Sequence, residues 1–258
     1  MLQAESSVAT RAAGVAGGIP SASELSCPPS LFGGLDVGAT DERAERDASF
    51  SIRVARTRTL YSTAQSLVSV RYAQRGYVQV PWGGSPEAHL LTLSAVGASG
   101  TLGTMGVRLD SAYGLKAEEA FEQEVCALRD SGRRLCEFTQ LALDHGTTSV
   151  PVLVSLFHAA HLYAYQIRGA QLLVIEVNPR HVAYYRRMLD FQVCSDVRQN
   201  PRVNAPAVLM SLDLAYGQQR IDELAGTRST SSRSLYPHFQ DAEGQRRLLA
   251  SLRAQIAA

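Results

Sequence analysis

The sequence is poor in lysine, and its cysteines form no pattern typical of a metal site. Lys116 is the only lysine among 25 basic side chains. The planar guanidinium group of arginine binds phosphate and carboxylate groups well. An excess of arginine over lysine more often reflects a GC-rich coding sequence. We therefore give no arginine weight merely because of its residue type.

The four cysteines, Cys27, Cys126, Cys136 and Cys194, lie far apart and form no CxxC motif. In a chain of 258 residues this spacing does not suit a disulfide framework, so we expect reduced thiols and a cytoplasmic protein. The N-terminus has no basic segment followed by an uninterrupted apolar run, so it does not predict a secretory signal.

Neither sign of charge dominates, because 25 basic side chains stand against 24 acidic ones. This balance does not predict a nucleic acid partner. The longest apolar run, at residues 150–167, is interrupted by His158, His161 and several other polar residues. It predicts a buried amphipathic helix rather than a membrane span.

The composition predicts two parts. Residues 1–48 are rich in Ala, Gly, Ser and Pro without a sustained period, which predicts a flexible leader. Residues 49–258 show regular patterns and are predicted to form a single domain that ends in an amphipathic helix.

Within that domain, apolar periodicity predicts an order of β-α-β-β-α-β-α-β-α-β before the final helix. The expected strands lie near residues 50–58, 88–110 (a hairpin turning at the GASG of 97–100), 133–144, 170–177 and 205–216. The expected helices lie near 59–78, 111–132, 149–169, 178–191 and 241–257, with Thr59, Ser149 and Asn178 as N-caps and Gly132 at a C-terminus. This order predicts an α+β fold, with a mixed central sheet flanked by helices.

Four stretches in succession carry a family resemblance: SVRYAQRGYV (69–78), GTMGVRLDSAYGL (103–115), GRRLCEFTQLALD (132–144) and VNPRHVAYYRRMLDF (177–191). Together they resemble the long-chain N-acyl amino acid synthases of the FeeM type, a branch of the GNAT acyltransferase superfamily that is itself similar to acyl-homoserine lactone synthases. The resemblance covers roughly residues 50–214.

The resemblance implies a GNAT-like fold and an amide-forming reaction. The amine of an amino acid would attack a fatty acyl thioester, with no tightly bound cofactor. Acetyltransferases of the superfamily grip the pyrophosphate of coenzyme A with a glycine-rich loop before the long helix. Here that segment has one glycine, Gly146, and no arginine. This favours acyl carrier protein over coenzyme A as the donor.

The resemblance assigns the substrate-handling glutamate of the family to Glu137. This side chain would bind the α-ammonium, or take a proton from it directly or through water. The alternative is a strand-end glutamate paired at the surface with Arg133 or Arg134. Homoserine lactone synthases carry an arginine three positions later, where this chain has Gln140, which argues against a lactone synthase.

Arg108 and Arg71 match arginines of the same motifs. Either could bind the carboxylate of the amino acid or hold a neighbouring acidic side chain. Arg71 has a simpler explanation as a cation near the negative end of a helix.

Tyr185 matches the tyrosine that GNAT enzymes commonly place, in a YxxxGF pattern, to protonate the departing pantetheine thiolate. Asp190, before Phe191, stands where that pattern has glycine, but four residues rather than three separate it from Tyr185. Packing is the other explanation for Tyr185, because Val182, Tyr185 and Leu189 form one apolar stripe. Packing is the expected role of Tyr184.

Leu153, Phe157 and Leu162 are candidates for an acyl pocket, although ordinary core packing explains them equally well. His158 and His161 have the spacing of one helical turn, but no third ligand accompanies them, so we expect no metal site. A satisfied core imidazole is the expected state of both.

Two other functions fit the same residues: a GNAT-fold enzyme using acyl-coenzyme A on another amine, and a degenerate acyl-binding relative. An acidic carrier protein would meet an arginine-rich surface, with Arg129, Arg133 and Arg134, or Arg186 and Arg187, as candidates. The resemblance implies an amino acid and acyl carrier protein as partners.

Overall fold

The computed structural model describes residues 49–77, 89–144, 150–227 and 234–257. The chain divides into two units, Met1–Asp36 and Val37–Ala258, and the first lies outside the described residues. The predicted boundary after residue 48 falls at the edge of the described part and stays a prediction.

The strands are β1 (Ser51–Val54), β2 (Leu90–Gly97), β3 (Gly100–Leu109), β4 (Leu135–Leu143), β5 (Leu172–Val177), β6 (Gln192–Val193), β7 (Arg198–Asn200) and β8 (Ala205–Asp213). The helices are α2 (Arg58–Ala73), α3 (Glu118–Asp130), α4 (Val150–His161), α5 (Val182–Leu189), α6 (Leu214–Leu224) and α7 (Ala242–Ala257). Three short elements, η2 (Leu162–Ile167), η3 (Pro179–His181) and η4 (Tyr236–His238), complete the described fold.

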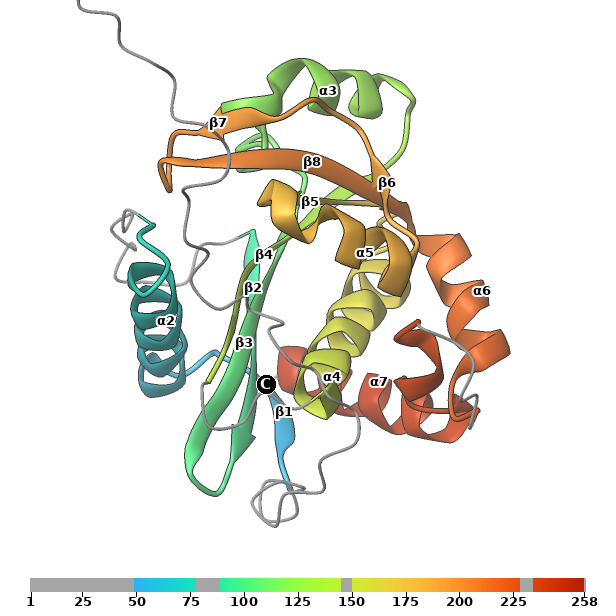
Figure 1. The fold of residues 1–258 in the computed structure, drawn as a ribbon. Helices are drawn as coiled ribbons and strands as arrows, with labels where there is room; N and C mark the ends of the chain where they lie inside the picture. The colour runs from blue at the N-terminus through green and yellow to red at the C-terminus, as the bar shows by residue number, and fades with distance from the viewer. Residues whose placement is uncertain (1–48, 78–88, 145–149, 228–233, 258) are drawn as a thin grey trace, which may run out of the picture. The chain divides into compact units, whose positions relative to one another are not determined.

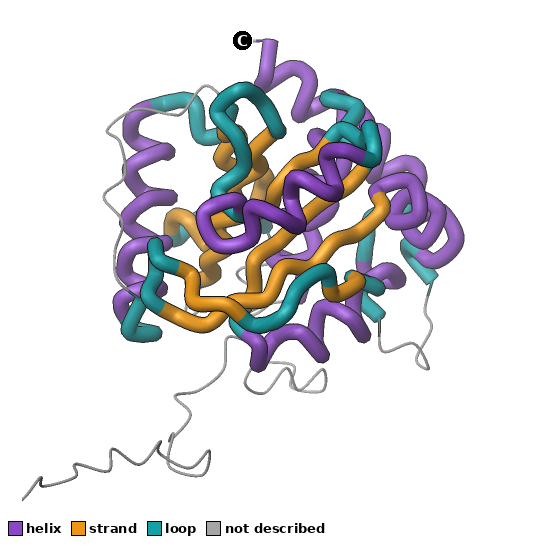
Figure 2. Tube along the Cα trace, turned by 90° about the horizontal axis from the view of Figure 1, so that it is seen from above, coloured by secondary structure: helices purple, strands orange, loops and turns teal. Residues whose placement is uncertain are grey.

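One mixed sheet organises the described residues, in the order β1-β2-β3-β4-β5-β8-β6, with β7 paired to β8. Only the β4–β5 pairing within this sheet is parallel. Helices lie on both sides of the sheet, with α2 and α4 on opposite sides of β2, β3 and β4 (Figures 1 and 2). The predicted fold class is confirmed.

Helix α4 is a core helix, as expected from its composition. Of the described helices, the stretch Val150–Ile167 alone is long and apolar enough to span a membrane, and 67% of it is buried within the fold. Gly103 of β3 lies at this contact, where a Cβ would be 3.1 Å from the Leu156 and Val152 side chains of α4 and 2.8 Å from Leu143 of β4.

Several local predictions hold. Gly97 and Gly100 pair at the end of the β2–β3 hairpin, as the GASG signal indicates. The Asn178 side chain accepts a hydrogen bond from the backbone N–H of Arg180 at 3.3 Å and caps η3. Gly132 follows α3 with a φ of 76°.

Other local predictions were wrong. The N-cap of α2 is Thr57 rather than Thr59, and its hydroxyl accepts from Leu60 N at 3.3 Å. The last strand ends at Asp213, because this side chain caps a helix by accepting from Tyr216 N at 2.9 Å. Strands β6 and β7 and helix α6 were not anticipated, and the predicted cap Ser149 lies outside the described residues.

Candidate active site

The site is built where strand β4 separates from strand β5. The two strands pair only from Leu135–Glu137 to Leu172–Val174, although both continue beyond that pairing. Figure 1 shows β5 and β8 crossing away from the β2–β4 half of the sheet. The opening therefore begins immediately after Glu137.

A β-bulge in β4 borders this opening. Thr104 pairs with Ala142 and Gly106 with Thr139, so β4 has one more residue than β3 in this interval. Gln140 adopts a φ of 56° within it. A bulge leaves main-chain groups of its strand outside the ladder, where they are able to bind another molecule. Strand β4 therefore bulges close to the place where it parts from β5.

Glu137 is the last residue of β4 that pairs with β5, and it is 1% exposed. Its Oε2 accepts a hydrogen bond from Lys116 N at 2.7 Å, and the backbone N–H of Ala117 also bonds to the carboxylate. Arg133 instead pairs with Asp213, and Arg134 bonds to the Gly169 carbonyl at 2.6 Å. The alternative of a surface ion pair for Glu137 was therefore wrong.

A second carboxylate, Glu176 of β5, lies on the same face of the sheet. Glu137 is in register with Val174, and Glu176 lies two residues farther along β5, so its side chain points to the same face. Arg202, from the turn between β7 and β8, donates to Glu176 Oε2 and to the Lys116 carbonyl. Asn200 Nδ2 also donates to Glu176 Oε2 at 3.2 Å.

Burial controls the protonation of both carboxylates. Burial raises the pKa of Glu137, while Arg202, the bonded N–H of Lys116, and Arg108 act in the opposite direction. Burial raises the pKa of Glu176 to about 8, against the lowering influence of Arg202, and the charge of Glu137 raises it further. Two acidic groups with perturbed pKa values in one opening are typical of an acid–base site.

The structure places Arg108 across from Glu137 in the sheet and Arg71 on helix α2. Arg108 is 4% exposed and lies directly across from Glu137 in the β3–β4 register. Arg71 lies in the last turn of α2, where Nη1 donates to Gln74 Oε1 at 2.9 Å. Burial lowers the pKa of Arg71, and Asp144 partly offsets this.

The Gln140 side chain lies over Gly106, where a Cβ would be 3.0 Å from Gln140 Oε1. Within the described residues this buried Oε1 has no hydrogen-bond partner. The bulge thus presents an amide oxygen that a bound molecule could satisfy.

Tyr185 is buried in an aromatic cluster beside the opening. Its ring lies edge-on to Phe157 at 6.4 Å, to Phe191 at 5.7 Å and to Tyr184 at 5.6 Å between centroids. Burial raises the pKa of Tyr185 well above its usual value, and Tyr184 and Tyr72 add to this. The hydroxyl therefore stays protonated at neutral pH.

Asp190 explains the departure from the YxxxGF pattern. Its φ of 60° lies in the left-handed region that favours glycine, and aspartate tolerates this region better than most residues. The Asp190 carboxylate accepts from the Tyr216 hydroxyl at 3.2 Å. Helix α5 therefore ends on a left-handed residue that is not glycine.

The three candidates for an acyl pocket are all buried, and Phe157 is the one at the opening. Its ring lies 6.4 Å from that of Phe138 in β4 and the same distance from Tyr185. Leu153 and Leu162 are 2% and 0% exposed and belong to the core.

The two histidines of α4 are satisfied core residues. His161 Nε2 lies 3.0 Å from Gln218 Oε1, and His158 Nε2 lies 3.3 Å from Gln245 Oε1. Burial lowers the pKa of both to about 4. Both imidazoles are therefore neutral at pH 7. His161 contacts α6 through Gln218, and His158 contacts α7 through Gln245.

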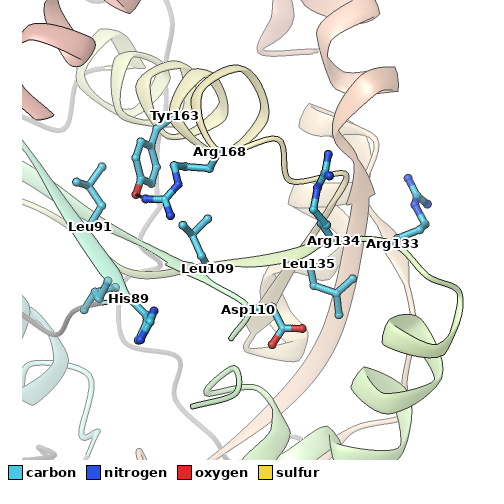
Figure 3. A pocket seen from close by; sticks show the side chains of 10 residues that line it. His89, Leu91, Leu109, Asp110, Arg133, Arg134, Leu135, Tyr163 and Arg168 are labelled. Carbon is cyan, nitrogen blue, oxygen red and sulfur yellow. Dashed lines mark hydrogen bonds between the residues drawn. The ribbon is translucent and has the colours of Figure 1, made fainter. Parts of the chain in front are cut away.

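A pocket of about 420 Å³ lies near the beginning of β4, at the other end of this strand from the bulge. Figure 3 shows Tyr163 and Arg168 reaching into it from the helix above the sheet. Its charged groups are engaged within the fold, since Asp110 pairs with Arg129 and Arg168 donates to the Tyr163 hydroxyl at 3.0 Å. None of the predicted site residues lines it.

Sequence reasoning missed Glu176, Arg202 and Asn200. Glu176 had a signal, because it is the one carboxylate in the apolar stretch LLVIEV, as Glu137 is before Asp144 in its own strand. The sequence has no comparable signal for Asn200 and Arg202, because the segment that precedes them shows no regular pattern. They lie 24 and 26 positions from Glu176 along the chain.

Comparison with solved structures gives several matches. The solved structure of FeeM, an N-acyl amino acid synthase from uncultured soil microbes, matches with 24% identity and a TM-score of 0.61, over 66% of this chain and 95% of FeeM. The CoA-dependent acyl-homoserine lactone synthase MesI matches with 15% identity and a TM-score of 0.41, over 71% and 100%. Arabidopsis thaliana NAA60 with acetyl-CoA matches with 12% identity and a TM-score of 0.47, over 65% and 99%.

The family model for the N-acyl amino acid synthase FeeM matches residues 63–213. The chain therefore belongs to the N-acyl amino acid synthase FeeM family, and it is an acyltransferase. Comparison with curated protein sequences gives no match.

Proposed function

We propose that this protein joins the amine of an amino acid to a fatty acyl group carried as a thioester by acyl carrier protein. The observation that carries the proposal is the pair of buried carboxylates, Glu137 and Glu176, where β4 and β5 separate. An acceptor ammonium is attracted to this negative charge. We place the reaction in the cytoplasm, in keeping with the free thiols of Cys126, Cys136 and Cys194.

The proposed acceptor site uses four predicted residues. Glu137 attracts the α-ammonium, and Arg202 and, less strongly, Arg108 across from it favour the ionised form of that carboxylate. We assign the carboxylate of the acceptor to Arg71, and a hydrogen bond from the acceptor to the open oxygen of Gln140.

The proposed donor site lies between the bulge and helix α5. Main-chain N–H groups of the bulge would stabilise the oxyanion. The acyl chain would begin against Phe157, with Leu153 and Leu162 deeper in the core. The single-glycine segment that favours acyl carrier protein includes Gly146, which lies outside the described residues.

Tyr185→Phe is expected to lower kcat by about tenfold, because the departing thiolate would lose its proton donor. Thiolates leave readily, so the effect lies below the usual range for general acids. The measurement is steady-state turnover of the palmitoyl thioester. Tyr184→Phe is the matched control and should leave kcat within about twofold of the wild type. Equal effects of the two substitutions would show that Tyr185 acts only in packing.

Arg186 and Arg187 are the strongest candidates for contact with the carrier. Both are exposed on α5, which also holds Tyr185. No carboxylate of the described residues forms an ion pair with either, whereas Arg129 and Arg133 pair with acidic side chains.

Replacing both Arg186 and Arg187 with Glu is expected to lower kcat/KM for palmitoyl carrier protein by about tenfold, because association with an acidic partner slows. Turnover of palmitoyl-coenzyme A should change much less. An equal loss with both donors would contradict a carrier-binding role for these arginines.

The function is tested by incubating the purified protein with palmitoyl carrier protein and a mixture of amino acids, followed by mass spectrometry. The proposal predicts a palmitoylated amino acid. Turnover of acetyl-coenzyme A without any acylated amino acid would reject it in favour of an ordinary acetyltransferase.

A further inference from the structure

We propose that Glu176 is the carboxylate that takes the proton from the acceptor amine. The inference rests on the proposed transfer to an amine, but not on which amine or which carrier is used. It separates the roles of the two carboxylates: Glu137 attracts the ammonium, and Glu176 accepts its proton.

The two oxygens of Glu176 have different surroundings. Oε2 accepts hydrogen bonds from both Arg202 and Asn200. Oε1 is buried and has no hydrogen-bond partner within the described part of the chain. A buried acceptor without a donor is costly in a resting fold, and an ammonium N–H from the substrate would satisfy it.

Glu137 is less suited to this step. Its carboxylate already accepts hydrogen bonds from the backbone N–H groups of Lys116 and Ala117, which favour the ionised form. It is 1% exposed at the last β4–β5 pair. The side chain of Glu176 is 10% exposed and belongs to β5 two residues beyond that pair, where the strands have parted.

The charges around Glu176 suit a proton acceptor. The titratable and charged groups facing it are Glu137 from β4, Glu119 from α3, Tyr72 from α2 and Arg202 from the β7–β8 turn. Burial and the two acidic neighbours raise the pKa of Glu176 to about 8. A base whose pKa lies near the working pH transfers protons efficiently in both directions.

The proposed step balances as follows. The acceptor ammonium gives one proton to Glu176 Oε1, and the neutral nitrogen attacks the thioester carbonyl, forming the C–N bond. The C–S bond then breaks, and the thiolate leaves as a thiol after receiving a proton from Tyr185. The second nitrogen proton restores the Tyr185 hydroxyl, directly or through water, and Glu176 releases its proton to solvent.

Glu176→Gln is expected to lower kcat by about a hundredfold or more, while KM for the amine changes by less than about threefold. The kcat/KM of the wild type should rise with pH around the pKa of Glu176, and the variant should lack this rise. The pH profile should be measured with two amines whose ammonium groups differ in pKa. A midpoint that is the same for both amines belongs to a group of the enzyme, whereas a midpoint that shifts with the amine belongs to the substrate.

A second measurement does not depend on turnover. A carboxyl whose pKa is raised by folding holds its proton in the native state up to about pH 8, so its contribution to stability falls as pH rises from about 4 to 8. The wild-type Tm should decline over this interval, and the decline should be shallower in Glu176→Gln.

Glu223→Gln on exposed α6 is the matched control and should behave as the wild type. A Glu176→Gln variant with a kcat within about threefold of the wild type would overturn the inference and leave the proposed function standing. A wild-type protein that acylates no amine would instead reject the proposed function, and with it the assignment of Glu176.

Discussion

The Glu137→Gln variant is expected to form N-acyl amino acid at least about tenfold more slowly than the wild type at low amino acid concentration. Two unit charges about 5 Å apart interact by about 3 kcal/mol at an effective dielectric constant near 20. Removing the negative charge of Glu137 therefore weakens attraction of the ammonium. The measurement is kcat/KM for the amino acid, with the thioester saturating.

Glu137→Gln is a close test because the substitution removes the negative charge of the side chain and keeps its shape. Its amide oxygen still accepts from Lys116 N, so the first turn of α3 keeps its anchor. Glu243→Gln, on the exposed surface of α7, is the control. A kcat/KM equal to that of the wild type would show that Glu137 has only a structural role.

Arg202→Met is expected to lower the free energy of unfolding by about 3 kcal/mol or more near pH 8, because it removes the cation that acts most strongly on the buried carboxylates. Arg202 is the group that most strongly opposes the raised pKa values of both Glu137 and Glu176. Without it, both carboxylates are harder to keep ionised. The loss should shrink toward pH 5, where protonation removes the uncompensated charge.

Denaturant unfolding at the two pH values checks this prediction. Arg247→Met is the control, because Arg247 forms an exposed pair with Glu243 and its loss should cost less than about 1 kcal/mol. Adding Glu176→Gln to Arg202→Met should recover part of the stability. An equal loss at both pH values would contradict charge compensation as the role of Arg202.

The fold could be predicted because its signals are local or carried by known motifs. The GASG turn fixed the β2–β3 hairpin, and the apolar stretch before Asn178 marked β5. Helix α6 was missed because Gly217 interrupts its pattern, yet this glycine packs against the His161 ring. Helix α6 begins after Asp213, whose side chain is its N-cap. The sequence alone does not distinguish this cap from the last residue of a strand.

The site could be predicted only in part. Glu137 and Arg108 were each candidates from the motifs, but their position opposite one another on neighbouring strands comes from the β3–β4 register. The ion pair of Glu176 with Arg202 depends on a turn reaching over the sheet from 26 positions away. The hydrophobic periodicity of a sequence does not predict an ion pair between residues so far apart. The pairing of the two carboxylates was therefore found only in the structure.

Acyl transfer to an amine is tested most directly by following thiol release and amide formation together. Palmitoyl carrier protein and an amino acid mixture would be sampled at matched times for free carrier thiol and for palmitoylated amino acid. The account predicts one amide for each thiol released, with both lost in parallel in Glu176→Gln. Thiol release without amide would mean hydrolysis and would contradict the account, as would the absence of both products.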